Sequence, residues 1–231
     1  MDSIIEVVRC FENSNIIHVD GVINPTNDIE IIELELIYAD LETVSKRRER
    51  LKKQLKADKS LIKEDLVLEK IEKALNEGKS ARRLELTEEE RDIIKSLSLL
   101  TLKPLMYVAN VDEETIQDIE KNENFKKVKQ YAESQNAKVI PICVKLEEEI
   151  SSIESEDERK EFLEMMGLDK SGLDRLIIAS YDILGLMSYL TVRRNRSKSM
   201  DYKKRDKSTK SGIKDTFRYR KRVYKSRNCI I

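Results

Sequence analysis

A short apolar run near the middle of the chain constrains the fold more than any other stretch. Pro104 interrupts a helical pattern, and residues 105–109 are then continuously apolar before the polar Asn110 and Glu113. A run of this length predicts a strand buried on both faces, as in a parallel sheet. The amide of Asn110 and the carboxylate of Glu113 would follow the carboxyl end of that strand, where open α/β sheets bind their ligands.

This Asn-x-x-Glu spacing suits one kind of ligand. An amide both donates and accepts hydrogen bonds, whereas a carboxylate accepts them from ring or exocyclic N–H groups, so the pair can hold a flat heterocycle such as a base. A motif this short also occurs in ordinary strand-to-loop turns. On pattern alone, both interpretations remain open.

Two further apolar segments predict more strands. Residues 4–8 are mostly β-branched and suit a strand buried on both faces, and residues 137–143 form another short run. An amphipathic helix is predicted over 120–135, so strand 105–109, this helix and strand 137–143 make a parallel βαβ unit. Further helices are predicted over 155–166 and 172–186.

The segment between the first two strands has helical periodicity. Apolar residues recur at helical spacing over 27–56, where Asn27 and Glu30 are placed as a capping box. They recur again over 61–75, and Gly78 follows in the position of a C-cap. Two such helices joined by a short loop predict an antiparallel hairpin.

A second capping box, Thr87 with Glu90, opens a third helix that contains Leu100 and ends before the proline. Residues 27–101 therefore form a predicted helical insertion between strands. A solvated coiled-coil hairpin of another protein class would have the same pattern, so the periodicity alone does not choose between them.

Composition supports long helices and excludes several classes of protein. The 231 residues are 39% hydrophobic and 38% charged, with only 6 Gly and 3 Pro. No apolar run reaches the roughly 18 residues of a membrane span, and no export signal opens the chain. The odd number of cysteines (Cys10, Cys143 and Cys229) and the single His leave no metal-ligand cluster, so a reduced, cytoplasmic setting is predicted.

The net charge is zero, yet the two signs are unevenly distributed. Residues 193–231 hold 16 Lys and Arg against 3 Asp and Glu, which leaves 28 basic and 41 acidic residues for 1–192. The body is therefore near −13 and the tail near +13. Such a split indicates that the two parts did not share one selective history.

Several segments carry a resemblance to a known family. VVRCFENSNIIHVDG, IIELELIYADLETVSKR, LLTLKPLMYVANVDE and LGLMSYLT, spread from about Asp2 to Val192, closely resemble the YchF or Obg-like ATPase family of P-loop NTPases. The resemblance implies an α/β fold, with part of a P-loop NTPase parallel sheet and an inserted α-helical coiled-coil hairpin. The implied domains are a first nucleotide-binding segment over 1–26, the insertion over 27–101, a second nucleotide-binding segment over 102–187 and an aberrant, disordered basic tail over 188–231.

The same resemblance implies a ligand and a partner. In the family, Asn-x-x-Glu contacts the base and favours adenine, so Asn110, Val111 and Glu113 become candidate residues for binding ATP or GTP. A second base-contacting segment follows the last strand, and it corresponds here to Cys143, Val144 and Lys145. A buried core thiol is the other interpretation of Cys143. The family is similar to ribosome-associated NTPases, which implies the ribosome as partner and the hairpin as its docking arm.

One expected motif is absent from the sequence. No G-x-x-x-x-G-K-[ST] occurs, and no switch segment precedes the first strand. We therefore expect a chain that starts inside the domain, with a bare backbone edge on strand 4–8. Nucleotide hydrolysis depends on the missing parts, so we expect negligible ATPase activity, and Mg²⁺ only in the intact family protein.

The tail has three competing interpretations. Clustered Lys and Arg with interleaved aromatic residues could bind RNA nonspecifically, or the tail could be inert and disordered. The third is a frameshift, because Met200 followed by Asp201, read one nucleotide later, must give the Trp that the family has at the start of its next domain. No specific DNA binding is predicted. The alternative function is a non-enzymatic helical module whose basic tail docks on ribosomal RNA.

Overall fold

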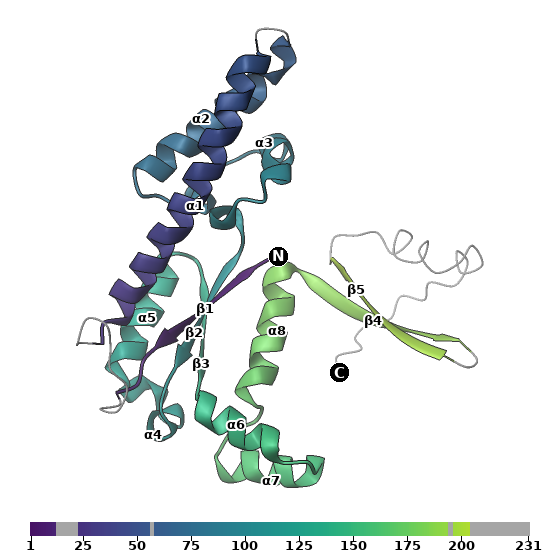
Figure 1. The fold of residues 1–231 in the computed structure, drawn as a ribbon. Coiled ribbons are helices and arrows are strands. Elements are labelled where there is room, and N and C mark those ends of the chain that lie inside the picture. The colour runs from purple at the N-terminus through teal and green to yellow at the C-terminus, as the bar shows by residue number, and fades with distance from the viewer. Residues whose placement is uncertain (13–22, 56–57, 194–195, 204–231) are drawn as a thin grey trace. The chain divides into compact units, whose positions relative to one another are not determined.

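The computed structural model describes residues 1–12, 23–55, 58–193 and 196–203, arranged as two units, Met1–Leu176 and Ile177–Ile231 (Figure 1). The strands are β1 (Ile4–Arg9), β2 (Leu105–Asn110), β3 (Lys138–Ile142), β4 (Leu186–Arg193) and β5 (Arg196–Lys203). The helices are α1 (Pro25–Gln54), α2 (Ile62–Asn76), α3 (Glu88–Ile94), α4 (Glu113–Ile116), α5 (Glu123–Ser134), α6 (Val144–Ser152), α7 (Glu156–Met165) and α8 (Gly172–Leu184).

Three parallel strands form the sheet of the first unit, in the order β1-β2-β3. Ile4 pairs with Leu105 at one end of the β1 and β2 ladder, and Arg9 pairs with Asn110 at the other. The predicted α/β class and the parallel βαβ unit are confirmed. Because all three strands run the same way, their carboxyl ends meet at one edge of the sheet.

The middle strand β2 is buried on both faces, as its continuous apolar run predicts. On one face Tyr107 and Ala109 pack with Val8, with Ile29 of α1 and with Val128 of α5. Strand β1 is less buried than expected, because it lies at the edge of the sheet. The side chains of Ile5 and Val7 are 40% and 64% exposed, so the prediction that both faces are buried is wrong for this strand.

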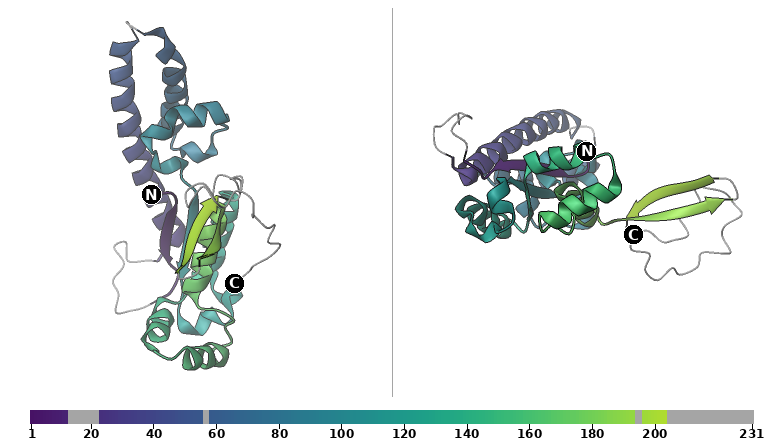
Figure 2. Two further views of the ribbon diagram at one scale, coloured as in Figure 1. Left: turned by 90° about the vertical axis from the view of Figure 1, so that its right-hand side faces the viewer. Right: turned by 90° about the horizontal axis from the view of Figure 1, so that it is seen from below.

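Helices α1 and α2 form the predicted antiparallel hairpin (Figure 2). Its core consists of apolar residues at helical spacing, among them Ile37, Val44 and Leu51 on α1 and Leu68 and Ile71 on α2. As predicted, Gly78 follows the end of α2 with φ of +72°, a left-handed conformation that glycine adopts without strain. The hairpin therefore has a hydrophobic core of its own.

Two helix ends differ from those predicted. Helix α1 begins at Pro25, and its N-cap is Asn24, whose Oδ1 accepts from the N–H of Asn27 at 3.5 Å. The capping box predicted at Asn27 is therefore wrong, because a proline at the first helical position already moves the helix start upstream. The box of Thr87 with Glu90 is confirmed at the start of α3.

Helix α3 ends at Ile94, before the predicted end near Leu100, and Ser98, with φ of +49°, turns the chain out of the helical path before a buried carboxylate on α1 binds the next segment. Asp40 accepts hydrogen bonds from the N–H of Leu100 at 2.8 Å and from the N–H and hydroxyl of Thr101 at 2.7 and 2.6 Å. These bonds satisfy backbone groups of a short 3-10 turn, Leu100–Leu102, directly before β2. Asp40 thus ties the hairpin to the segment that enters the middle strand.

A second polar contact joins α1 to α5. Glu33 accepts a hydrogen bond from the Tyr131 hydroxyl at 3.0 Å and lies 3.7 Å from a nitrogen of Arg83. Glu6 of β1 lies close to this group, and burial together with the negative charge of Glu33 raises the pKa of Glu6 to about 7. Arg82 partly offsets the shift, and Asp28 adds to it.

The second unit contains the antiparallel pair β4 and β5, in which Leu186 pairs with Lys203 and Arg193 with Arg196. The sequence predicts disorder from residue 188, whereas the described part of this tail forms strands. The composition of β4 explains why that strand forms, because it is rich in apolar and β-branched residues. Residues 204–231 of the predicted tail lie outside the described residues. Among the helices described, none is long and apolar enough to span a membrane.

We predict that Asp40→Ala lowers the free energy of unfolding by about 3 kcal/mol. The substitution leaves the backbone N–H groups of Leu100 and Thr101 without their hydrogen-bond acceptor. Urea denaturation followed by circular dichroism measures this loss. Glu35→Ala, an exposed carboxylate on the same helix, is the control and leaves the midpoint unchanged. Equal midpoints for the two variants would show that the Asp40 contacts contribute nothing.

The raised pKa of Glu6 predicts a pH-dependent stability. A carboxyl whose pKa rises on folding stabilises the folded state below its unfolded pKa of about 4.5 and loses that contribution as pH rises to about 7. Glu6→Gln should therefore raise the free energy of unfolding at pH 8 and change it little at pH 5. Urea titrations of both proteins at the two pH values test this, and a difference independent of pH would contradict it.

Candidate functional site

The carboxyl edge of the sheet brings together segments that are far apart in the sequence. The N–H of Cys10, just after β1, donates to the carbonyl of Asn110 at 2.8 Å. The N–H of Val111 donates to the carbonyl of Ile142 at the end of β3, at 2.9 Å. These bonds extend the sheet by one residue on each side of β2, so Asn110 lies in the centre of this edge.

Asn110 is held in a defined orientation by the start of α6. Its Oδ1 accepts a hydrogen bond from the N–H of Val144 at 3.2 Å. This bond leaves the Nδ2 group as a donor, and no acceptor for it is found within the described residues. The segment after β2 thus contacts the segment after β3 directly.

Glu113 lies at the first position of α4, where it can reach the same region. The N-cap of α4 is the neighbouring Asp112, which accepts from the N–H and hydroxyl of Thr115 at 2.8 and 2.6 Å. The carboxylate of Glu113 forms an ion pair with Lys145 at 2.8 Å. Hydrogen bonding to Glu113 raises the pKa of Lys145. The Lys145 side chain is exposed, whereas Glu113 is half-buried and its Oε1, the atom that contacts Lys145, is shielded from solvent.

The other two predicted residues are placed differently. The side chain of Val111 is buried in the core, so only its backbone belongs to the edge. Cys143 is buried as well, and burial raises the pKa of its thiol, while the N–H groups of Leu146 and Lys145 partly oppose the shift. The segment that begins at Cys143 is the N-cap and first turn of α6, which directs the N–H of Val144 toward Asn110.

Asn122 is a residue of this edge that the sequence interpretation missed. It caps α5 by accepting from the N–H of Phe125 at 2.8 Å, and its Nδ2 donates to the carbonyl of Cys10 at 3.0 Å and lies 3.4 Å from the hydroxyl of Thr115. It thereby joins β1, α4 and α5. An Asn before a helix indicates an N-cap in the sequence. The contact with Cys10 joins residues 112 positions apart, so no local sequence pattern predicts it.

Helix α6 is itself anchored by a carboxylate. Glu147 accepts hydrogen bonds from the N–H groups of Gly172 at 2.6 Å and Leu173 at 3.0 Å, and so caps the start of α8. A Cβ atom at Gly172 would lie 2.9 Å from the Glu147 carboxylate and 3.0 Å from the Ile142 side chain, so a larger residue would displace the capping carboxylate. The helix that presents Val144 and Lys145 is therefore fixed from a second side.

The edge can serve as a half-site for a flat polar ring. Asn110 offers an oriented N–H donor, Glu113 offers carboxylate oxygens, and Lys145 offers a long side chain next to both. The described residues include no cluster of acidic, His or Cys side chains that could hold a metal ion. The geometry therefore supports recognition by hydrogen bonding.

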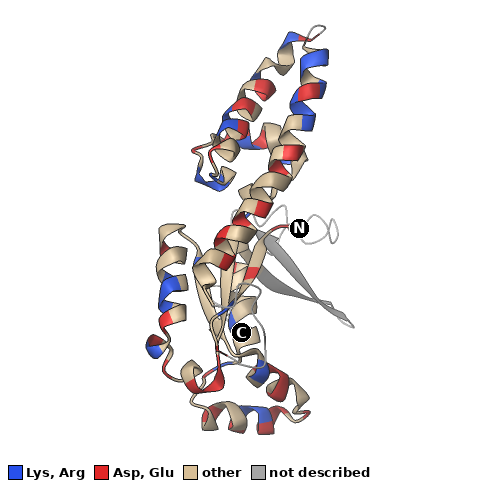
Figure 3. Cartoon of the chain, turned by 60° about the vertical axis from the view of Figure 1, so that its left-hand side comes forward, with Lys and Arg blue, Asp and Glu red and all other residues tan. Residues whose placement is uncertain are grey.

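A second candidate surface is the outer half of the hairpin. In α1 every charged residue from Asp28 to Glu42 is acidic, whereas those from Lys46 to Lys53 are basic except for Glu49. Figure 3 shows this change of sign along the helix. An acidic start and a basic end both interact favourably with the helix macrodipole. The basic end also concentrates positive charge at the far end of the hairpin.

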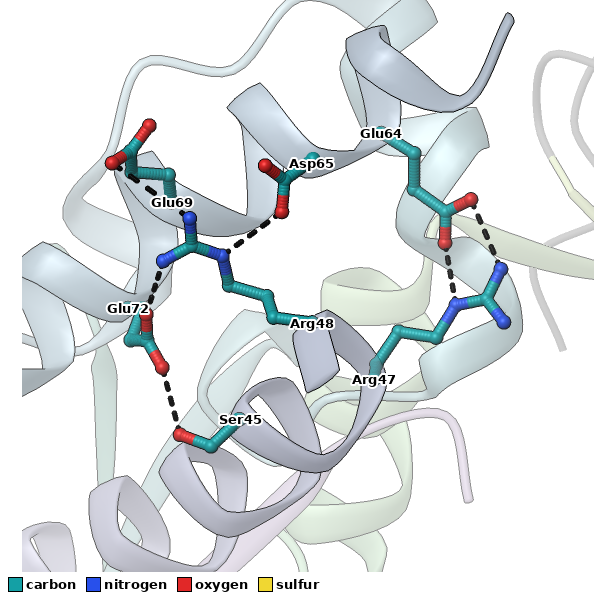
Figure 4. A network of polar contacts seen from close by, with 7 residues as sticks. All are labelled: Ser45, Arg47, Arg48, Glu64, Asp65, Glu69 and Glu72. Carbon is teal, nitrogen blue, oxygen red and sulfur yellow. Dashed lines mark hydrogen bonds and ion pairs between the residues drawn. The ribbon is translucent and has the colours of Figure 1, made fainter. Parts of the chain in front are cut away.

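Part of this positive charge is neutralised inside the hairpin. Arg47 binds Glu64 through two nitrogens, at 2.7 and 3.0 Å, and Arg48 forms ion pairs with Asp65 at 3.1 Å and with Glu72. Figure 4 shows the network of Ser45, Arg47, Arg48, Glu64, Asp65, Glu69 and Glu72.

The cations nearer the tip have no such neutralisation. They are exposed, and no ion-pair partner for them is found within the described residues: Arg50, Lys52, Lys53, Lys59 and Lys63. Clustered, unpaired cations on a projecting hairpin are typical of a surface that contacts a polyanion.

Comparisons with known proteins agree with these features. The chain is 46% identical over 205 residues to the ribosome-binding ATPase YchF of Bacillus subtilis, covering 88% of this chain and 56% of that protein. It is 43% identical over 191 residues to the ribosome-binding ATPase YchF of Escherichia coli O157:H7, covering 82% of this chain and 52% of that protein. No family model matches the chain.

A solved structure gives the same result. The YchF GTPase of Schizosaccharomyces pombe superposes with a TM-score of 0.79 at 32% identity, covering 93% of this chain and 58% of that one. The chain thus spans about half the length of the relatives it matches.

Proposed function

Because this chain belongs to the YchF family over the residues that it shares with these relatives, we propose that it supplies the base-binding half of a nucleotide site and a hairpin that docks on the ribosome. The observation that carries the first part is the contact between two distant segments. Asn110 meets Val144, and Glu113 meets Lys145, at the carboxyl edge of the sheet where open α/β folds bind ligands.

In this proposal the base of ATP lies across the edge. Asn110 Nδ2 donates to a ring nitrogen, while Glu113 accepts from the exocyclic amino group of adenine. Lys145, whose side chain is exposed, moves off Glu113 and lays its aliphatic part over the ring, and the amino group of the base takes its place at the carboxylate. Val111 and Cys143 support the site from the core and through their backbone. GTP is the second candidate ligand.

The described residues offer the triphosphate no site comparable to the one proposed for the base. The 231 residues contain no G-x-x-x-x-G-K-[ST] motif, and the described residues offer no metal-holding cluster for Mg²⁺. Phosphoryl transfer depends on positioning and charge stabilisation by such groups. We therefore propose that this chain, tested by itself, binds adenine nucleotides weakly and does not hydrolyse them.

The ribosome is the proposed partner because the bacterial relatives are named as ribosome-binding and because the hairpin tip is basic. Phosphate groups of ribosomal RNA would contact the exposed cations of the tip. In this proposal each domain predicted from the sequence has its own role. Segments 1–26 and 102–187 carry the base site, 27–101 carries the docking hairpin, and 188–231 carries neither.

We predict that the chain binds a fluorescent adenine nucleotide and that Asn110→Ala weakens this binding by about tenfold, as expected for the loss of an oriented hydrogen bond. Anisotropy titration measures the affinity, and a phosphate-release assay on the same samples should show no turnover. Asn76→Ala, an exposed asparagine at the end of α2, is the matched control. Equal affinities of the two variants would contradict the proposed base site.

We also predict that Lys52→Glu, Lys53→Glu and Lys59→Glu together abolish co-sedimentation with 70S ribosomes. Each lost phosphate contact should also reduce, by about one, the steepness with which the logarithm of the association constant falls with the logarithm of the salt concentration. The matched control reverses three exposed lysines away from the hairpin, namely Lys127, Lys160 and Lys170. If deletion of 193–231 removes binding and the hairpin variant does not, the tail is the docking element and the alternative function is correct.

A further inference from the structure

A chain of hydrogen bonds connects Asn110 to α4 through Asn122. The N–H of Cys10 donates to the carbonyl of Asn110 at 2.8 Å, and the carbonyl of Cys10 accepts from Nδ2 of Asn122 at 3.0 Å. The same Nδ2 lies 3.4 Å from the hydroxyl of Thr115 on α4. Asn110 and α4 are therefore both tied to one residue, which directly follows β1.

The side chain of Asn122 has a fixed orientation. It is buried, with 8% of its surface exposed, and its Oδ1 accepts from the N–H of Phe125 at 2.8 Å. Because a backbone N–H can bond only to the oxygen of the amide, the nitrogen must face Cys10. Both ends of the amide are thus satisfied, as is usual for a buried polar side chain. The donor role toward Cys10 is distinct from the cap that Asn122 provides for α5.

Helix α4 depends on such contacts for its position. It has four residues, too few to be stable by itself, and it lies beyond the carboxyl ends of the strands (Figure 1). At its start Asp112 accepts from the N–H and hydroxyl of Thr115, and at its end the side chain of Ile116 is buried in the core. Glu113 is its first residue. A displacement of α4 would therefore change the distance between the Glu113 carboxylate and the Asn110 amide.

We propose that Asn122 is a positioning residue of the base site, which holds α4, and with it Glu113, at the distance from Asn110 that an adenine ring requires. This role rests on the base site proposed above. Asn122 acts only through Glu113 and does not itself touch the nucleotide. Asn110 would keep its bond to a ring nitrogen if α4 moved, because the N–H of Val144 orients its amide independently. Asn122 therefore governs the contact with the exocyclic amino group, and so the choice of base, more than the overall affinity.

Competition of two triphosphates for the site of a bound fluorescent adenine nucleotide tests the choice of base. ATP is compared with purine riboside triphosphate, which has a hydrogen in place of the exocyclic amino group and so cannot donate to Glu113 there. Asn122→Asp keeps the oxygen that caps α5 but has no N–H for Cys10. We expect it to lower the preference for ATP over purine riboside triphosphate by about tenfold.

Two further variants separate this effect from charge and from folding. Asn122→Ser also keeps a capping oxygen, but its side chain is too short to reach Cys10, so it should lower the preference for ATP without an added charge. Asn76→Asp, at an exposed asparagine on α2, is the matched control and should leave the preference unchanged. Circular dichroism of each variant checks that the fold is retained.

Amide hydrogen exchange without nucleotide tests the structural part separately. Asn122→Asp should speed the exchange of the Thr115 and Ile116 amides by about tenfold and leave that of Phe125 unchanged. Faster exchange in α4 together with a lost preference for ATP supports the proposal. A preference that persists in both Asn122 variants, or unchanged exchange in α4, overturns it while the base site stands. A chain without affinity for adenine nucleotides would instead refute the base site, and the positioning role with it.

Discussion

Parallel pairing of β2 with a strand on each side is the interaction on which the rest of the first unit depends. The strand is buried on both faces, so every backbone group must be bonded within the sheet. The register that satisfies them also places Asn110 between the ends of β1 and β3. From there the chain enters α4, and β3 enters α6. The meeting of Glu113 with Lys145 is therefore a consequence of the ladder, because the two helices begin at adjacent points of one edge.

The helical hairpin is joined to this sheet by buried polar groups more than by apolar packing alone. Asp40 binds the turn that leads into β2, and Glu33 accepts from Tyr131 on α5. Carboxylates buried in this way are costly unless every oxygen is bonded, so they tolerate few alternative orientations of the helix. Glu6 lies close to the same contacts, and its burial, together with the negative charge of Glu33, raises its pKa to about 7. The orientation of the hairpin and the position of β2 are thus physically coupled.

Local patterns predicted most of the elements but not the contacts between them. The apolar run before Asn110 is sufficient to identify β2, because burial on both faces leaves a continuous signal. The turn between α3 and β2 is held by Asp40, which is distant in sequence, and Asn122 contacts Cys10, 112 positions away. Strand β5 contains no β-branched residue, so its pairing with β4 has no signal in its own composition. At the candidate site the residue types were predictable from resemblance, whereas the bond between Asn110 and Val144 required the fold.

The same ladder explains why the carboxyl edge of the sheet carries the candidate site. Parallel strands collect their carboxyl ends on one side, which concentrates amides, carboxylates and helix starts there. The strand β3 is held in place from its other side as well, because Arg175 of α8 donates a hydrogen bond to the carbonyl of Pro141 at 3.1 Å. The end of β3 and the start of α6 are therefore fixed by contacts on both sides, and with them the N–H of Val144 that orients Asn110.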